Sequence, residues 1–190
     1  MSQQYSEYES HFNGVVYREL SRFVDSRGTT TEFFTNRSLP ENFRLFKVTQ
    51  LMEATSVDCV IRGIHYSAPD NPQYKIVRCL RGNIKDIVVD LRPGSATFGE
   101  WRVFELSEDN SSVLFIPHGF GHAYEVVSSH ATVVYALDTS FQFDKEYSIH
   151  PMDKDLSLPW TKQDHTLSEK DSSAKSFENV CKELLQFYSS

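Results

Sequence analysis

Short apolar runs separated by turn residues fill the middle of the chain. Between residues 75 and 137 these runs alternate or are continuous, and none has the spacing of an amphipathic helix. They predict strands at Lys75–Arg81, Asn83–Leu91, Trp101–Leu106, Ser112–Ile116, His122–Val127 and Thr132–Leu137. The breaks are rich in residues that favour turns, as in Arg92-Pro93-Gly94. Many short strands at such close spacing indicate an all-β sandwich or barrel.

Helical spacing occurs only near the C-terminal end. The segment Ser176–Tyr188 places four apolar residues on one stripe, which predicts an amphipathic helix packed on the barrel. The polar stretch Gln163–Lys175 before it has the composition of a linker. We therefore expect one domain over residues 1–190, with a helical segment from about residue 165 to 190.

Composition and charge narrow the function classes. The chain has 190 residues, 39% hydrophobic and 24% charged, as in ordinary globular proteins. A net charge of -7 argues against nucleic acid or an anionic membrane as the main partner. Three cysteines, Cys59, Cys79 and Cys181, lack the spacing of a metal site, which suggests reduced thiols in a cytoplasmic protein. The first ten residues are neither basic nor apolar, and no run approaches the length of a membrane span.

One stretch concentrates the candidate chemistry. In DCVIRGIHYSAPDNPQYKIVRC, residues 58–79, His65 lies three places after Arg62 and ten before Lys75. An imidazole can act as a base near neutral pH, an arginine suits phosphate oxygens, and a lysine can stabilise an oxyanion. Taken alone, Lys75 would more often be interpreted as a solvated strand residue.

A second motif, PHGFGH at residues 117–122, resembles the second conserved box of the cupin barrels. Many cupins bind a metal through a His-x-His pair and a glutamate, and His65, His118, His122 and Glu125 are the candidate ligands here. The His-x-His box is missing, however, and Lys75 would repel a cation. We therefore favour a site without a metal.

Over most of its length the chain resembles the thymidine-diphosphate-4-keto-6-deoxyhexose epimerases, the family of the rhamnose-pathway 3,5-epimerase. The similarity rests on several motifs in the same order, namely DSRGTTTEFF (25–34), RGIHY (62–66), DIVVDLRPGSATFGEW (86–101), FIPHGFGHAYEV (115–126), DLSLPW (155–160) and LSEKDSSA (167–174). This resemblance implies a cupin-type double-stranded β-helix. It also implies inversion of C3, C5 or both next to a C4 ketone, through an enolate and without a cofactor.

The resemblance implies a role for each matching residue. His65 matches the base, Asp171 the carboxylate that orients it, Lys75 the group at the C4 oxygen, and Tyr135 the general acid on the other face. Without the family pattern, Asp171 would be interpreted as a helix N-terminal acid and Tyr135 as a core aromatic.

The nucleotide would be held by further matching positions. These are Arg27, Glu32, Gln50, Arg62, His122, Glu146 and Lys170. In the family, the Arg27 and Glu32 positions reach the neighbouring subunit's site through an exchanged N-terminal strand. The resemblance therefore implies a homodimer in which residues 1–35, approximately, are exchanged.

Two positions depart from the family pattern. Met52 stands where the family has an amide, and Phe141 stands where it has a second tyrosine, which leaves the inverted carbon and the pathway open. Two other functions remain to be distinguished: a 3,4-ketoisomerase acting on the same sugar nucleotide, and a non-catalytic cupin that binds a sugar nucleotide or a metal.

Overall fold

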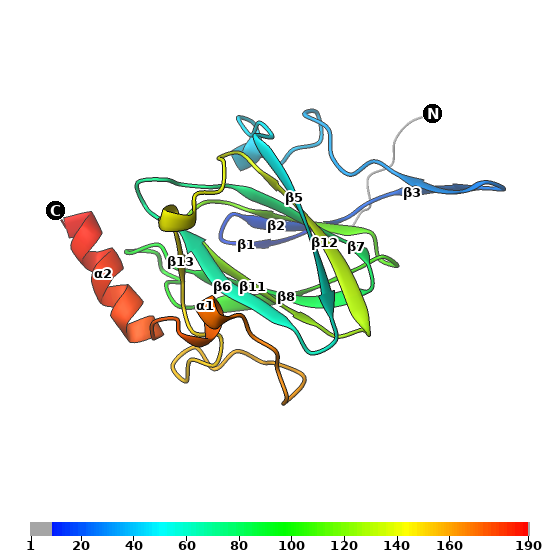
Figure 1. Cartoon of the computed structure of the whole chain (residues 1–190). Coiled ribbons are helices and arrows are strands. Elements are labelled where there is room, and N and C mark those ends of the chain that lie inside the picture. Colours follow the sequence, from blue (N-terminus) through cyan, green and yellow to red (C-terminus); the bar gives the residue numbers. More distant parts are fainter. Residues whose placement is uncertain (1–8, 190) are drawn as a thin grey trace.

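Two antiparallel sheets face each other in the computed structural model, which describes residues 9–189 (Figure 1). The six-stranded sheet has the order β1 (Glu9–Phe12), β2 (Val15–Glu19), β10 (Ser112–Ile116), β7 (Lys75–Arg81), β12 (His130–Leu137), β5 (Gln50–Val57). The five-stranded sheet has the order β13 (Glu146–Ser148), β6 (Ile61–Ser67), β11 (Phe120–Val126), β8 (Asn83–Asp90), β9 (Trp101–Ser107). The short 3-10 turns are Glu41–Phe43 and Phe143–Lys145, and the helices are α1 (Glu169–Ser172) and α2 (Phe177–Ser189).

The all-β architecture predicted from the strand pattern is confirmed. All six predicted strands are present as β7 to β12, with ends that differ by at most two residues. The predicted C-terminal helix is confirmed as α2, and its residues Val180 and Leu184 are buried against the five-stranded sheet. Within the described residues, neither helix combines the length and the apolar character needed to cross a bilayer.

Apolar side chains fill the space between the sheets and also cover both outer faces. The central cluster draws residues such as Val77, Val88 and Leu114 from both sheets. A second cluster holds the C-terminal part of the chain on the outer face of the five-stranded sheet. A third holds Phe43 and Phe46 on the outer face of the six-stranded sheet. Strand β11 is therefore buried at every position, which explains why its sequence shows no polar alternation.

The prediction of a linker at Gln163–Lys175 is wrong. Thr166 forms a parallel bridge with Val60, Lys175 forms one with Ile149, and α1 lies between them. Polar residues suit this segment because it runs over the surface of the barrel, yet its backbone is hydrogen-bonded to the strands below. Its composition alone does not reveal those bonds.

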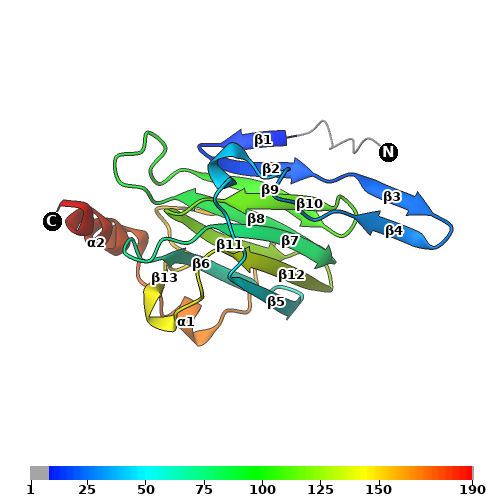
Figure 2. The same ribbon diagram turned by 90° about the horizontal axis from the view of Figure 1, so that it is seen from above.

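A hairpin projects from the body of the protein. Strands β3 (Arg22–Asp25) and β4 (Gly28–Thr31) pair only with each other, and seven of their eight residues are exposed. Both views place this hairpin at the end opposite α2 (Figure 1, Figure 2). At its base, Arg22 donates a hydrogen bond of 2.7 Å to the carbonyl oxygen of Asp109.

Gly63 allows β6 and β11 to approach each other closely. It has a φ of +112°, and a Cβ there would lie 2.4 Å from the carbonyl oxygen of His122. The obstructing atom is backbone, which cannot rotate away. The close approach brings His65 opposite His122 in the register of the two strands.

Gly63→Ala is expected to lower the free energy of unfolding by about 1–3 kcal/mol more than Gly94→Ala does. Gly94 is a matched control, because it too has a positive φ but has no atom within 4 Å of an added Cβ. Urea unfolding of both variants measures the difference, and equal losses of stability would contradict the close approach.

Candidate active site

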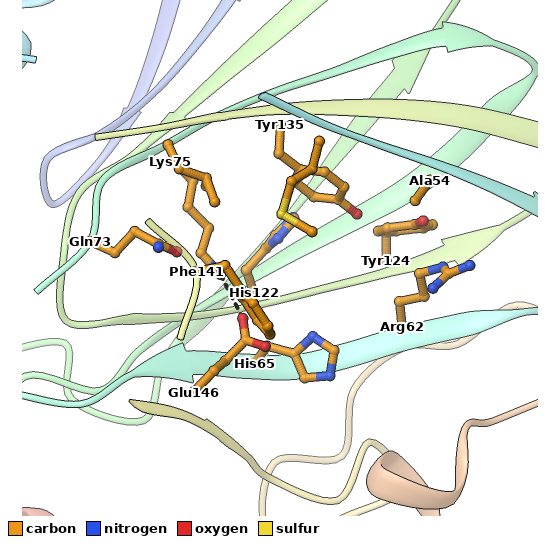
Figure 3. A pocket seen from close by; sticks show the side chains of 12 residues that line it. Ala54, Arg62, His65, Gln73, Lys75, His122, Tyr124, Tyr135, Phe141 and Glu146 are labelled. Carbon is orange, nitrogen blue, oxygen red and sulfur yellow. Dashed lines mark ion pairs between the residues drawn. The ribbon is translucent and has the colours of Figure 1, made fainter. Parts of the chain in front are cut away.

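A cavity of about 220 Å³ opens between the edge of the six-stranded sheet formed by β5 and β12 and the edge of the other sheet formed by β6 and β13 (Figure 3). Its walls combine charged, aromatic and apolar side chains from both sheets. They are Met52, Ala54, Arg62, His65, Gln73, Lys75, His122, Tyr124, Tyr135, Leu137, Phe141 and Glu146. Residues far apart in the sequence thus share one cavity that combines polar and apolar groups.

His65 is paired with Asp171. Its Nε2 lies 2.6 Å from Oδ1 of Asp171, whose side chain is only 3% exposed. Burial alone would raise the pKa of Asp171, but the hydrogen bond and charge of His65, helped by Ser168, hold this pKa below its ordinary value. An ionised Asp171 therefore accepts the Nε2 proton of His65, and the lone pair of the neutral ring lies on Nδ1.

The segment that delivers Asp171 is fixed by a buried carboxylate on β11. Glu125 is fully buried and accepts hydrogen bonds from the backbone amides of Thr161 and Lys162, at 2.8 Å and 2.9 Å. His165 lies 3.1 Å from the same carboxylate. Glu125 therefore faces away from the cavity and holds residues 161–165 against the sheet, six residues before Asp171.

Lys75 lies at the inner end of the cavity beside Glu146. Its Nζ is 3.6 Å from Oε1 of Glu146, and the two side chains are 11% and 15% exposed. Burial lowers the pKa of Lys75, while the charges of Glu146 and Asp86 oppose that shift. Lys170 approaches the same glutamate from α1, at 3.4 Å, so one carboxylate faces two cations.

A second pair of histidine and carboxylate lies deeper in the barrel. Nε2 of His122 is 2.8 Å from Oδ2 of Asp86, and both side chains are buried. The ring of His122 lies between two phenols, with centroid distances of 6.4 Å to Tyr124 and 6.1 Å to Tyr135. Asp86 thus fixes a ring that forms part of the cavity wall.

Tyr135 approaches from the opposite sheet to His65. His65 comes from β6 and Tyr135 from β12, and Figure 3 shows them on opposite sides of the cavity. Burial, together with the charge and hydrogen bond of Tyr124, holds the pKa of Tyr135 well above its ordinary value. The phenol therefore keeps its proton at neutral pH.

The other predicted residues fall into two groups. Arg62, His122 and Glu146 line the cavity, and Lys170 lines an adjoining one of about 370 Å³ that shares His65 and Arg62 with it. Gln50 lies beside the entrance, where its side-chain oxygen accepts a hydrogen bond from the amide of Phe141 at 2.6 Å.

Arg27 and Glu32 lie away from the cavity of their own chain. Arg27 is at the tip of the projecting hairpin, 88% exposed and paired with Asp25. Glu32 follows β4, and its Oε1 is buried without a hydrogen-bond partner in the described part of the chain. The structure therefore does not bring these two residues to His65.

Four lining residues were not predicted as site residues from the sequence, namely Ala54, Gln73, Tyr124 and Leu137, and neither was Asp86, which pairs with His122. Tyr124 follows His122 by two positions on one strand, so the period-2 rule already places both on the same face. Asp86 is a carboxylate in an apolar strand, which also marks a functional or paired position. Ala54, by contrast, carries no signal of its own.

The two departures from the family pattern both lie in the cavity wall. Met52 is the cross-strand partner of Tyr135, and Phe141 lies on the loop after β12. With Ala54 and Leu137 they form the apolar part of the cavity wall, and Arg62, His65, Lys75 and Glu146 form its charged part.

The candidate metal ligands are not assembled. Among the residues that the structure describes, no three histidine, cysteine, aspartate or glutamate side chains are placed to share a metal ion. His118 contacts the ring of Tyr74 and lines a different depression, and Glu125 is occupied by Thr161, Lys162 and His165. The four predicted ligands therefore do not form one site.

Comparisons with known proteins agree with this geometry. Residues 9–179 match the family model described as dTDP-4-dehydrorhamnose 3,5-epimerase. The chain is 35% identical over 164 residues to the dTDP-4-dehydrorhamnose 3,5-epimerase of Shigella flexneri, which covers 86% of this chain and 91% of the relative.

Two solved structures extend the comparison. A 3,5-epimerase from Legionella pneumophila, in complex with dTDP-4-keto-L-rhamnose, superposes with a TM-score of 0.85 and 31% identity over 92% of this chain and 94% of that one. A 3'-monoepimerase from Streptomyces bikiniensis, in complex with dTDP-quinovose, superposes with a TM-score of 0.84 and 29% identity. The match covers 93% of this chain and 92% of that one. The chain therefore belongs to the dTDP-4-dehydrorhamnose 3,5-epimerase family, which includes 3-epimerase members.

Proposed function

We propose that the protein inverts C3, C5 or both in a dTDP-linked 4-keto-6-deoxyhexose, as a step of deoxysugar biosynthesis. The observation that carries this proposal is the pair His65–Asp171 facing Tyr135 across one cavity. A C4 ketone acidifies the neighbouring carbons, so a base on one face and an acid on the other can invert either of them. No redox step is involved, and none of the roles requires a cofactor.

His65 is the base. Because its Nε2 proton is donated to Asp171, Nδ1 takes the proton from the sugar carbon. The imidazolium that forms is then stabilised by an ionised carboxylate at 2.6 Å. His65 is also partly exposed, 26% for the side chain, so it can return its proton to solvent after the reaction.

Lys75 stabilises the enolate oxygen. A cation at the inner, dry end of the cavity interacts more strongly with a developing oxyanion than it would in water. Glu146 opposes the effect of burial on the pKa of Lys75, which favours the charged form that this role requires. Glu146 thus supports the charge on Lys75 in addition to its expected contact with the nucleotide sugar.

Tyr135 is the acid. It lies on the sheet opposite His65, so its proton arrives on the face of the enolate that the base does not occupy. Inversion, rather than return of the same proton, follows from this placement. A phenol with a raised pKa holds its proton until a carbanion-like centre takes it.

The nucleotide occupies the outer part of the site in this proposal. Arg62 and Lys170 border the adjoining cavity and suit diphosphate oxygens, and His122, Gln50 and Glu146 complete the expected contacts. The ring of Phe141 offers a stacking surface for the base. We expect the enzyme to work in the cytoplasm, consistent with its three free cysteines.

A homodimer would complete this site. The projecting hairpin carries Arg27 outward, exposes Val24 to 74%, and is followed by Glu32, whose Oε1 is buried without a hydrogen-bond partner among residues 9–189. The outer face of the six-stranded sheet also exposes Leu51 and Val57, to 65% and 66%. A second copy docked there would bury these apolar groups and would place each hairpin at its partner's cavity.

Turnover in heavy water tests the chemistry directly. We expect incubation with thymidine-diphosphate-4-keto-6-deoxyglucose to introduce one deuteron for each inverted carbon, counted by mass spectrometry and located by proton NMR. His65→Asn should abolish incorporation, and Tyr135→Phe should abolish inversion. A product whose carbonyl has moved to C3, or no deuterium at all, would contradict the proposal.

Lys75→Met should lower kcat by about 10²–10³-fold, because the enolate loses the cation at the inner end of the cavity while side-chain volume is nearly conserved. Steady-state kinetics measure the change, and far-UV circular dichroism checks the fold. Lys47→Met, an exposed loop position, serves as the control and should retain full activity. Less than a tenfold loss in Lys75→Met would argue against the oxyanion role.

Mixed dimers test whether Arg27 acts in the partner's site. Arg27→Ala and His65→Asn should each be inactive at low substrate concentration. Co-expressed together, they should recover about one quarter of wild-type activity, since half of randomly assembled dimers are mixed and each of those contains one intact site. Failure of the mixture to recover activity, or a monomer by light scattering, would exclude the exchanged hairpin.

A further inference from the structure

Tyr124 is a buried tyrosine that the mechanism above does not use. Its side chain is 1% exposed, and its ring lies in the central core, yet it also lines the cavity beside Tyr135. Figure 3 shows the two tyrosines as neighbours in the cavity wall, and a side-chain hydrogen bond with Tyr124 is among the causes of the raised pKa of Tyr135. A hydroxyl buried in an apolar core is costly unless it has partners, so its contacts indicate a role beyond packing.

Those contacts continue toward the surface. The Tyr124 hydroxyl lies 3.5 Å from Oγ of Ser56, which is itself buried. The same Oγ accepts a hydrogen bond of 2.9 Å from Nε of Arg62, an exposed residue and the strand partner of Tyr124. A line of hydroxyl groups therefore runs from Tyr135 through Tyr124 and Ser56 to the solvent-exposed side of β6.

After each inversion, Tyr135 must regain a proton before the site can act again. The sugar carbon gives one proton to His65 and receives a different one from Tyr135, which leaves an imidazolium and a phenolate. The site is ready again only when His65 has lost one proton and Tyr135 has gained one. Both residues line the cavity that the bound sugar fills, but His65 also borders the adjoining cavity, where its side chain, 26% exposed, can exchange with water, and Tyr135 does not.

We propose that Tyr124 is a proton-relay residue, and that protons from solvent reach Tyr135 through the hydroxyl groups of Ser56 and Tyr124. In the relay, Tyr124 gives its proton to the Tyr135 phenolate and takes one from Ser56, which takes one from water beside Arg62. One O–H bond forms for each that breaks, and the chain ends with one proton gained. This inference rests on the proposed function, since it assigns the regeneration of its acid.

Tyr124→Phe separates the relay from a packing role, because it keeps the ring and removes only the hydroxyl. The first inversion uses a Tyr135 that is already protonated, so rapid-quench experiments in heavy water should show a burst of one deuterated product per site at nearly the wild-type rate. The following steady state should be about tenfold slower or more. A small protonated amine should restore part of it.

The pH profile gives a second readout. Because the hydroxyl of Tyr124 contributes to the raised pKa of Tyr135, its removal should lower that pKa and move the alkaline limb of kcat to lower pH. Ser56→Ala should also lower the steady-state rate of turnover, as Tyr124→Phe does. Tyr66→Phe, a buried tyrosine of β6 that does not line the catalytic cavity, should change neither the burst nor the steady state.

The outcomes distinguish this inference from the function on which it rests. If the wild type turns over and Tyr124→Phe matches it in steady state, the relay is overturned and the epimerase function stands. A burst that slows as much as the steady state would assign Tyr124 to the first proton transfer and would also overturn the relay. If the wild type incorporates no deuterium, both the function and the relay fall.

Discussion

The hydrogen bond between His65 and Asp171 joins two parts of the chain that lie 106 residues apart. It requires the C-terminal segment to leave the barrel, cover the outer face of the five-stranded sheet, and return at α1. The buried carboxylate of Glu125 and the bridge at Thr166 hold that path. The orientation of His65 therefore depends on contacts made by residues that do not line its cavity.

The cavity holds several charges in a setting that would otherwise favour apolar residues. Lys75 is next to Glu146, His122 is next to Asp86, and both pairs are nearly enclosed by the two sheets. Such pairs contribute little to stability, because desolvation offsets much of their attraction. Most of the stability therefore comes from the apolar clusters on both sides of each sheet. They explain why a small barrel can hold so polar a site.

The sequence predicts the strands well and the site only in part. Alternation and turn residues predict β7 to β12, because those signals are local and each strand forms one face of a core. Contacts between distant segments produce no local pattern in the sequence. Lys75 could be taken for a solvated residue, and Gln163–Lys175 for a linker, because burial by the opposite sheet and anchoring to β6 are tertiary effects. The family pattern, not the local spacing, supplied Asp171 and Tyr135 as partners of His65.

In the proposed mechanism, the number of carbons inverted depends on how the site is reset. One base and one acid can invert one carbon, after which His65 carries an extra proton and Tyr135 lacks one. A second inversion of the same bound sugar requires both groups to recover before release. His65 also borders the adjoining cavity and Tyr135 does not, so in this mechanism we expect the acid to recover its proton more slowly than the base loses its own. In that mechanism, the competition between proton return to Tyr135 and product release decides between one inversion and two.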